Sequence, residues 1–197
     1  PLGQMAQGAL KTGAHGGTQW HTPAMKNATV LIALAACGPL PTPELPQADA
    51  GHYTLVDPMT VQRVVDGDTI EVLRGDVTLR VRMKGIDTPE LAKEGNPAEA
   101  YAEEAKVFSA TNVGLQVDLE FDDICGADPF NAALCIDPYD RLLAYVRLAD
   151  GRDLNEELLR VGLARLFAMD GQPLDRIVQY EAAQRAAQQA NTGIWSR

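Results

Sequence analysis

The main part of this chain lacks histidine. Three histidines are present in 197 residues, and all of them, His15, His21 and His52, precede residue 57. A domain formed by the remaining residues has no imidazole to act as a general base or to ligate a metal. Ser–His–Asp and Cys–His schemes of nucleophilic catalysis are therefore excluded for that domain.

Long apolar runs are also lacking. The apolar segment at 28–36 is too short to span a bilayer as a helix. It follows Met25-Lys26-Asn27 and ends at Cys37, as the core of a signal peptide does. Leu34-Ala35-Ala36-Cys37 resembles the bacterial lipoprotein box, in which the cysteine receives the lipid; a cleaved secretory signal is the alternative.

These features divide the chain into four expected parts. We interpret residues 1–24 as an upstream extension or tag outside the fold, and 25–37 as a lipoprotein-type leader that directs export to the cell envelope or secretion. Residues 38–56 contain four prolines and resemble a semi-extended tether. The folded domain is expected at 57–197, anchored to a membrane through the lipid on Cys37, and we expect it to be a monomer.

Cysteine is scarce, with three in the chain. If Cys37 is lipidated, Cys125 and Cys135 remain, ten residues apart in a loop rich in Gly, Asp, Pro and Asn. Two thiols without a nearby histidine make a poor zinc site. In an oxidising compartment we expect them to form a disulfide.

Positive charge is the third scarcity. The net charge is −10, and all but two of the 17 basic and two of the 27 acidic residues follow Val56. An acidic domain repels polyanions on average, which argues against a general nucleic-acid coat protein.

Periodicity predicts the elements of this domain. Apolar and polar residues alternate in five short runs, which predicts strands, and helical spacing marks three further segments. The strands are expected at 59–65, 68–73, 77–86, 115–121 and 142–148, and the helices after Asn96-Pro97, from Asp153 to Arg160 and from 174 to about 190. This layout is α+β and mainly β, and it predicts a five-stranded OB-fold barrel with three helices.

Two aspartates stand at the ends of neighbouring strands. Asp66-Gly67 is typical of a hairpin turn, but Asp68 falls on the next strand and Asp87 ends the strand after it. Taken singly, Asp87 and Glu90 are expected in a solvated loop. Together, two carboxylates at one place repel each other unless a cation lies between them, and their oxygens suit calcium.

Three separated motifs resemble the thermonuclease (staphylococcal-nuclease-like) family. They are Val64-Val65-Asp66-Gly67-Asp68-Thr69-Ile70, Val81-Arg82-Met83-Lys84-Gly85-Ile86-Asp87-Thr88-Pro89-Glu90 and Asp137-Pro138-Tyr139-Asp140-Arg141-Leu142-Leu143-Ala144-Tyr145. Asn155 to Leu159, Gly162-Leu163-Ala164 and Gly193-Ile194-Trp195 also fit. The resemblance covers about residues 61–195 and implies hydrolysis of DNA and RNA, single strands preferred, to 3′-phosphate products.

The resemblance also implies a role for each site residue. Asp68 and Asp87 would bind calcium through carboxylates and Thr88 through its carbonyl. Glu90 would orient or deprotonate the attacking water. Phosphate contacts would come from Arg82, Arg141, Tyr139 and Lys84, the two guanidiniums acting as forks that match phosphate oxygens.

The sequence departs from the family at several positions. Ala168 and Asp170 stand where the family's type member has two base-flanking tyrosines, so stacking falls to Phe167 or another ring. Pro138 replaces a lysine. A non-catalytic OB-fold lipoprotein that binds a ligand or partner is the alternative function, and a purely structural envelope lipoprotein is a third. Arg82, Glu90, Arg141 and both aspartates together favour the enzyme.

Overall fold

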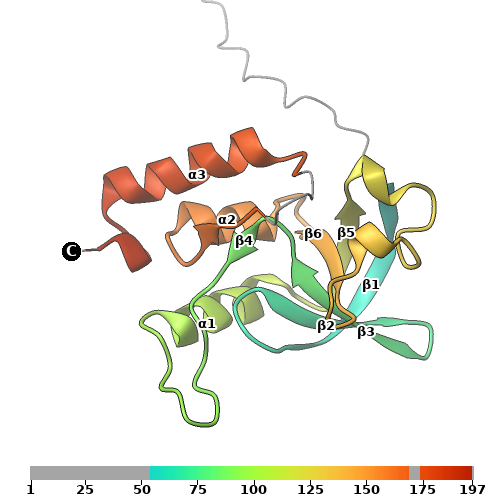
Figure 1. Ribbon diagram of the computed structural model, residues 1–197, viewed down its shortest axis with the longest axis horizontal. Helices are drawn as coiled ribbons and strands as arrows, with labels where there is room; N and C mark the ends of the chain where they lie inside the picture. Colours follow the sequence, from blue (N-terminus) through green and yellow to red (C-terminus); the bar gives the residue numbers. More distant parts are fainter. Residues whose placement is uncertain (1–53, 169–173, 197) are drawn as a thin grey trace, which may run out of the picture. The chain divides into compact units, whose positions relative to one another are not determined.

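The computed structural model of the chain describes residues 54–168 and 174–196 (Figure 1). The expected leader, Cys37 and nearly all of the tether lie outside these residues, and so does Asp170. The first strand begins at Thr54, three residues before the predicted start of the domain at 57.

Five strands close into a barrel, as predicted. They are β1 (Thr54–Val64), β2 (Thr69–Arg74), β3 (Val77–Met83), β5 (Gln116–Phe121) and β6 (Leu142–Arg147). Their order around the barrel is β1-β2-β3-β6-β5. All neighbours are antiparallel except β3 and β6, which run parallel. Alternate residues such as Ile70, Val72 and Val81 fill the interior.

A proline inside β1 is accommodated by a bulge. Val56 pairs with Leu119 and Met59 with Val117, so two residues of β1 lie opposite one of β5. Pro58 lies in this irregularity, where its missing N–H interrupts no regular ladder.

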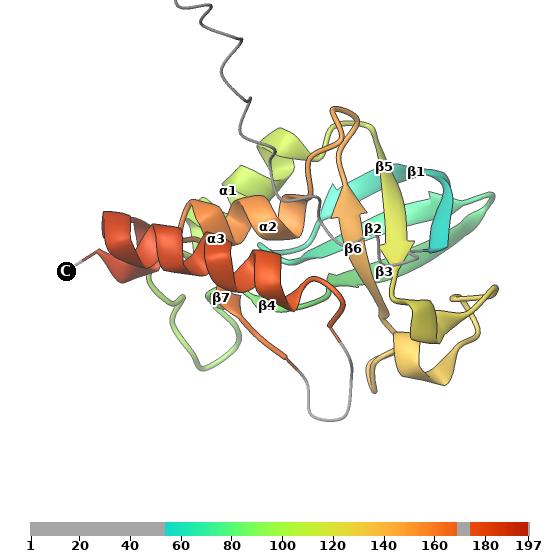
Figure 2. The same cartoon turned by 90° about the horizontal axis from the view of Figure 1, so that it is seen from above.

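Three helices lie to one side of the barrel (Figures 1 and 2). They are α1 (Ala102–Asn112), α2 (Leu154–Arg160) and α3 (Ile177–Ala190). The carboxylate of Asp153 caps α2 by accepting the amide protons of Asn155 and Glu156, and α2 packs against both β6 and α3. Among these helices, none has the length and apolar composition that a membrane crossing requires.

The third predicted strand, 77–86, is interrupted in the structure. Met83 ends β3, Lys84 and Gly85 form a turn, and Ile86–Asp87 forms the separate short strand β4. Gly85 has a φ of +82°, which glycine adopts without steric cost. β4 pairs with β7 (Arg165–Leu166) outside the barrel. The break therefore carries Asp87 out of the barrel wall and beside a segment from the C-terminal half.

Asn155 joins the strands next to this break. The side chain is fully buried. Its amide nitrogen donates to the carbonyls of Lys84, at 2.9 Å, and Ala144, at 3.3 Å, and its oxygen accepts from Val146 N at 3.2 Å. All three side-chain bonds go to backbone groups of the β3 end and β6, so we expect Asn155 to hold the end of β3 in place.

Replacing Asn155 with Ala should destabilise the protein. It would remove the side-chain partners of the Lys84 carbonyl and the Val146 amide, and we expect a loss of about 2–4 kcal/mol of unfolding free energy. Denaturant unfolding measures this. Asn131→Ala, in an exposed loop, is the control and should change stability by less than about 0.5 kcal/mol. Equal stability of the two variants would contradict the role given to Asn155.

Candidate active site

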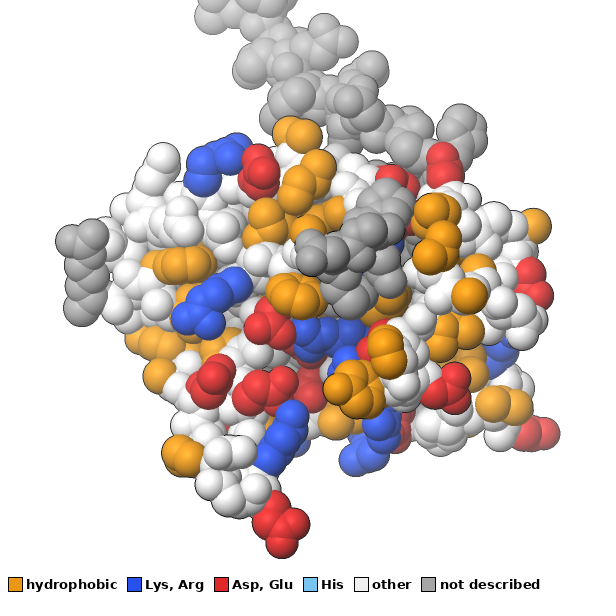
Figure 3. All heavy atoms as spheres, viewed as in Figure 1, with side chains coloured by type: hydrophobic (Ala, Val, Ile, Leu, Met, Phe, Trp, Pro, Cys, Tyr) orange, Lys and Arg blue, Asp and Glu red, His pale blue; other side chains and the backbone are white. Residues whose placement is uncertain are grey.

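A pocket of about 300 Å³ lies between the end of β3, strand β4 and the turn before β6. It brings together residues far apart in sequence that had been predicted as functional: Arg82, Lys84, Asp87, Glu90, Tyr139 and Arg141. Acidic and basic side chains are intermixed on the face seen in Figure 3, rather than segregated by sign.

Arg82 links the two aspartates. One guanidinium nitrogen forms an ion pair with Asp68, and the other lies 2.8 Å from Asp87 Oδ1 and 3.1 Å from the Ile86 carbonyl oxygen. The Arg82 side chain is 14% exposed and that of Asp68 only 1%. The carboxylates of Asp68 and Asp87 thus share one cation, the Arg82 guanidinium, which offsets the repulsion between them.

Asp68 is held from several sides. Its Oδ2 accepts the Thr88 amide at 2.8 Å and the Thr88 hydroxyl at 3.0 Å, and its Oδ1 lies 3.2 Å from the Thr69 hydroxyl. Thr88 packs close to Gly67, because a Cβ built on Gly67 would lie 2.6 Å from Thr88 Oγ1. Asp66 Oδ1 accepts the Asp68 amide at 3.2 Å and forms the turn, as expected.

The donor set of this site fits a hard cation. Asp68 and Asp87 each present a carboxylate oxygen to a different nitrogen of the Arg82 guanidinium. The residues described contain no cluster of three or more His, Cys, Asp or Glu side chains able to hold a metal. Calcium requires six or more oxygens, so backbone, water and substrate oxygens would have to complete its shell.

Glu90 lies at the rim of the pocket. Its side chain is 52% exposed, and its carboxylate lies 2.5 Å from Lys93 Nζ. Its backbone is fixed by Glu99: the Glu90 amide donates to the Glu99 carboxylate at 3.1 Å, and the Glu99 amide donates to the Glu90 carbonyl at 2.9 Å. Glu99 had not been singled out from the sequence.

A compact turn positions Arg141. Asp137 is buried, and its carboxylate accepts the amides of Tyr139 and Arg141, both at 2.9 Å, and Arg141 Nε at 2.7 Å. Burial would raise the pKa of Asp137, but the hydrogen bonds from Arg141 and Tyr139 outweigh it and lower the pKa. The Arg141 side chain keeps 23% of its surface exposed. In the sequence, the signal for this contact is the position of Asp137, an acceptor two residues before Tyr139 and four before Arg141 in a turn.

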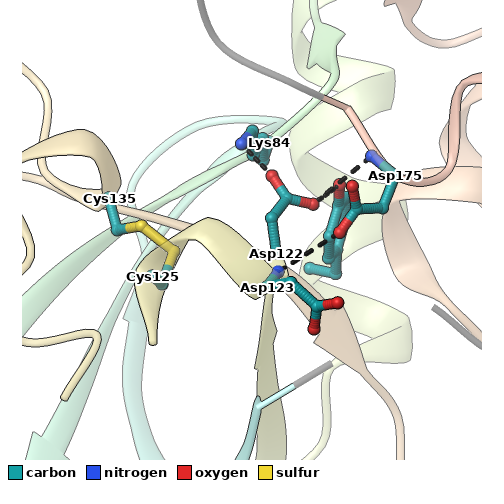
Figure 4. The surroundings of a disulfide bond; sticks show 7 residues. Lys84, Asp122, Asp123, Cys125, Cys135 and Asp175 are labelled. Carbon is teal, nitrogen blue, oxygen red and sulfur yellow. Dashed lines mark hydrogen bonds and ion pairs between the residues drawn. A yellow bond between two sulfur atoms is a disulfide. The ribbon is translucent and has the colours of Figure 1, made fainter. Parts of the chain in front are cut away.

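Lys84 lies in the pocket wall with its ammonium turned away from solvent. It is 5% exposed and forms an ion pair with Asp122 (Figure 4). Asp122 also accepts the Tyr145 hydroxyl. The predicted contact between Lys84 and substrate stays a prediction, and the observed pair gives the ammonium a structural task.

Cys125 and Cys135 form a disulfide, as predicted. It joins two short 3₁₀ turns, Asp123–Cys125 and Ala133–Cys135. The first follows Asp122 (Figure 4), and the second stands two residues before Asp137 in the sequence. Ile136 then forms a bridge to Leu142. The crosslink thus connects the partner of Lys84 to the turn that holds Arg141.

Phe167, the ring that could replace the base-flanking tyrosines of the family, lies at the pocket. Phe167 and Ala168 line the pocket, and Phe167 is 47% exposed. Its amide donates to the Gly85 carbonyl at 3.0 Å, which fixes it beside the break after β3. Tyr139, 76% exposed, presents a second ring 5.3 Å from the Arg141 guanidinium.

Barrel and pocket together define an OB-type fold with paired arginines, an aspartate pair and a glutamate at one mouth. Residues 80–197 match the family described as staphylococcal nuclease homologue. The chain is similar to a thermonuclease of Staphylococcus intermedius, at 38% identity over 70% of this chain and 75% of the relative. A thermonuclease of Staphylococcus hyicus is 35% identical over 81% and 84%. The endonuclease YncB of Bacillus subtilis is 33% identical over 71% and 62%.

The chain therefore belongs to the staphylococcal nuclease family. The predicted family is confirmed, and with it the predicted class of enzyme, the hydrolases that act on ester bonds.

Loss of the disulfide should weaken the protein and its site. In the chain-entropy account, a loop closed by a sequence separation of 10 stabilises by about 3 kcal/mol. We expect the Cys125→Ser, Cys135→Ser double variant to melt at a lower temperature and to lose activity through Arg141. Thermal unfolding and cleavage rates measure this, and a thiol reductant should not affect the variant. Unchanged melting and rate would refute the coupling.

Removing the Asp137 charge should lower activity with little loss of fold. In Asp137→Asn the guanidinium of Arg141 loses its ionic partner, and we expect kcat to fall about 10- to 100-fold, as for a misplaced catalytic group. Asp140→Asn, in the same turn but exposed, should retain nearly full activity. An equal effect in both variants would show that Asp137 does not position Arg141.

The stability contributed by Asp137 should depend on pH. Because its folded pKa is lowered, the contribution is complete above the unfolded value near 3.8 and is lost as pH falls through the folded value. Denaturant unfolding between about pH 6 and about pH 2 should show wild type and Asp137→Asn converging at the acid end. A constant stability difference would contradict the ionised Asp137.

Proposed function

We propose that the protein is a calcium-dependent endonuclease that hydrolyses phosphodiester bonds of DNA and RNA, with single strands preferred and 3′-phosphate products. The observation that supports this most directly is that Arg82, which pairs with buried Asp68 and with Asp87, lines one pocket together with Asp87, Glu90 and Arg141. The names of the relatives, thermonuclease and endonuclease, support the same class of substrate.

The pocket residues have distinct tasks in this proposal. Arg82 and Arg141 bind the phosphodiester through guanidinium forks and stabilise the negative charge that builds up in the transition state. Glu90, at the rim, orients the attacking water and accepts its proton. For this the Glu90 carboxylate must leave Lys93, which lies on an exposed loop.

Calcium would be held by Asp68, Asp87 and the Thr88 carbonyl. Bound there, it would polarise the phosphate and help to position the water. In the structure Thr88 contacts Asp68 through its amide and hydroxyl, which leaves its carbonyl available. Arg82 pairs with the same two carboxylates, so a bound cation would compete with the guanidinium for them and would leave it available to the phosphate.

Substrate binding should be weak and salt-sensitive. The net charge of −10 disfavours approach of a polyanion. Only the few guanidiniums at the pocket offset it locally, so an increase in salt should lower the rate.

The proposal places the enzyme outside the cytoplasm. The leader with Cys37 at its end suggests a lipid-anchored envelope protein, periplasmic or outer-membrane, or a secreted one. The Cys125–Cys135 disulfide supports an oxidising compartment.

Digestion of single-stranded DNA tests the activity. The wild-type protein should cleave in calcium and not in a chelator, and Glu90→Ser should reduce kcat at least about 100-fold, as loss of a general base does. Product ends should carry 3′-phosphate.

Glu94→Ser serves as the matched control, because Glu94 is an exposed glutamate of the same loop that does not line the pocket. Its activity should equal that of wild type. Absence of cleavage with every divalent metal tested would leave a non-catalytic barrel that binds a ligand or partner.

A further inference from the structure

A second hollow lies beside the candidate active site. It measures about 490 Å³ and is lined by Pro89, Glu99, Ala100, Tyr101, Arg165, Ile194 and Ser196. Pro89, in its lining, directly precedes Glu90 in the chain, and the Glu99 carboxylate accepts the Glu90 amide. The two pockets are therefore neighbours on either side of the segment that carries the predicted general base.

The β4–β7 pair connects them. Asp87 lies directly opposite Arg165, and Ile86 opposite Leu166. Residues directly opposite in an antiparallel pair project from the same face, so Asp87 and Arg165 point to one side of this small sheet. Phe167, two residues further on, lines the first pocket. One face of the pair thus leads from the first pocket into the second.

Arg165 differs from most other cations of the protein. Within residues 54–168 and 174–196, every lysine and arginine except Arg74, Lys106 and Arg165 forms an ion pair with a carboxylate. Among these exceptions, Arg165 alone lines either of the two pockets. An exposed guanidinium with no carboxylate partner keeps its charge available for an external anion.

The side chain of Arg165 is nevertheless held. Its guanidinium carbon lies 5.9 Å from the centre of the Trp195 ring, within cation–π range. Such a contact orients the guanidinium without neutralising it. The neighbouring hydroxyls of Tyr101 and Ser196 are 2.6 Å apart and hydrogen-bonded to each other, and the Glu99 carboxylate accepts the Glu90 amide. Among the residues that line this hollow, Arg165 is the one cation.

We propose that this hollow is a subsite for a flanking phosphate of the nucleic-acid strand, bound by Arg165. A strand that occupies the first pocket must leave it, and each further nucleotide carries a negative charge that an acidic surface repels. Arg165 supplies the cation at the exit. The inference rests on the proposed nuclease function and extends it from one phosphodiester to a longer strand.

Two substrates separate this subsite from the active site. One is an oligodeoxynucleotide of about 20 residues, long enough to fill an OB-type site; the other is a phosphodiester of a single nucleoside, which fills the first pocket only. Arg165→Gln should raise KM for the long strand several-fold with kcat unchanged, lower the slope of log KM against log salt by about 0.7, and leave the short substrate unaffected.

Matched variants complete the experiment. Arg165→Lys should recover most of the affinity for the long strand, and Arg74→Gln and Lys106→Gln, which line neither pocket, should behave as wild type. Equal effects of Arg165→Gln on both substrates, or no effect on the long one, would overturn the subsite.

Binding distinguishes failure of the subsite from failure of the proposed function. Trp195 fluorescence in a Trp20→Phe background reports the occupancy of the hollow. If wild type cleaves nothing but binds the long strand through Arg165, the subsite stands without the nuclease. If it neither cleaves nor binds the strand, both proposals are wrong.

Discussion

The bridge from Arg82 to Asp68 and Asp87 is the interaction on which the rest of the site depends. A carboxylate as buried as Asp68 needs charged or hydrogen-bonding partners, since an unpaired buried charge costs several kcal/mol. The fold supplies them from three directions, with Thr69 at the start of β2 next to Asp68, Arg82 across the hairpin and Thr88 beyond the turn. These contacts also bring Asp87 and Glu90 to the mouth of the barrel.

A second constraint acts where β3 ends. The turn at Lys84-Gly85 diverts the chain into β4, and Asn155 satisfies the backbone exposed by that diversion. Lys84, at this turn, forms a buried ion pair with Asp122. The Cys125–Cys135 disulfide links the segment after Asp122 to the segment before Asp137, whose carboxylate holds Arg141. The two arginines of the pocket are thus held by different carboxylates, Arg82 by Asp68 and Asp87 and Arg141 by Asp137.

Most of the barrel could be predicted from the sequence, because alternation over 69–73 and 116–121 is a local signal with one buried face. The break at Gly85 was missed, although the alternation of Val77 to Lys84 stops there and Ile86 falls out of phase with it, as a glycine that ends a strand allows. The motif residues were found, but two supporting contacts were not: Asp137 holds Arg141 within a local turn, and Glu99 binds the backbone of Glu90. The burial of Lys84 likewise depends on Asp122, 38 residues away, and no local pattern shows it.

Calcium binding tests the central claim, that Asp68 and Asp87 form a cation site now bridged by Arg82. Calorimetric titration of the whole protein with calcium should show one site, lost in Asp87→Asn. In Arg82→Gln, the removal of the competing guanidinium should give tighter binding and a larger rise of Tm with calcium than in wild type, because bound ligand stabilises the folded state. If the titration shows no calcium binding to wild type, or the same binding to Asp87→Asn, Asp68 and Asp87 do not form a cation site.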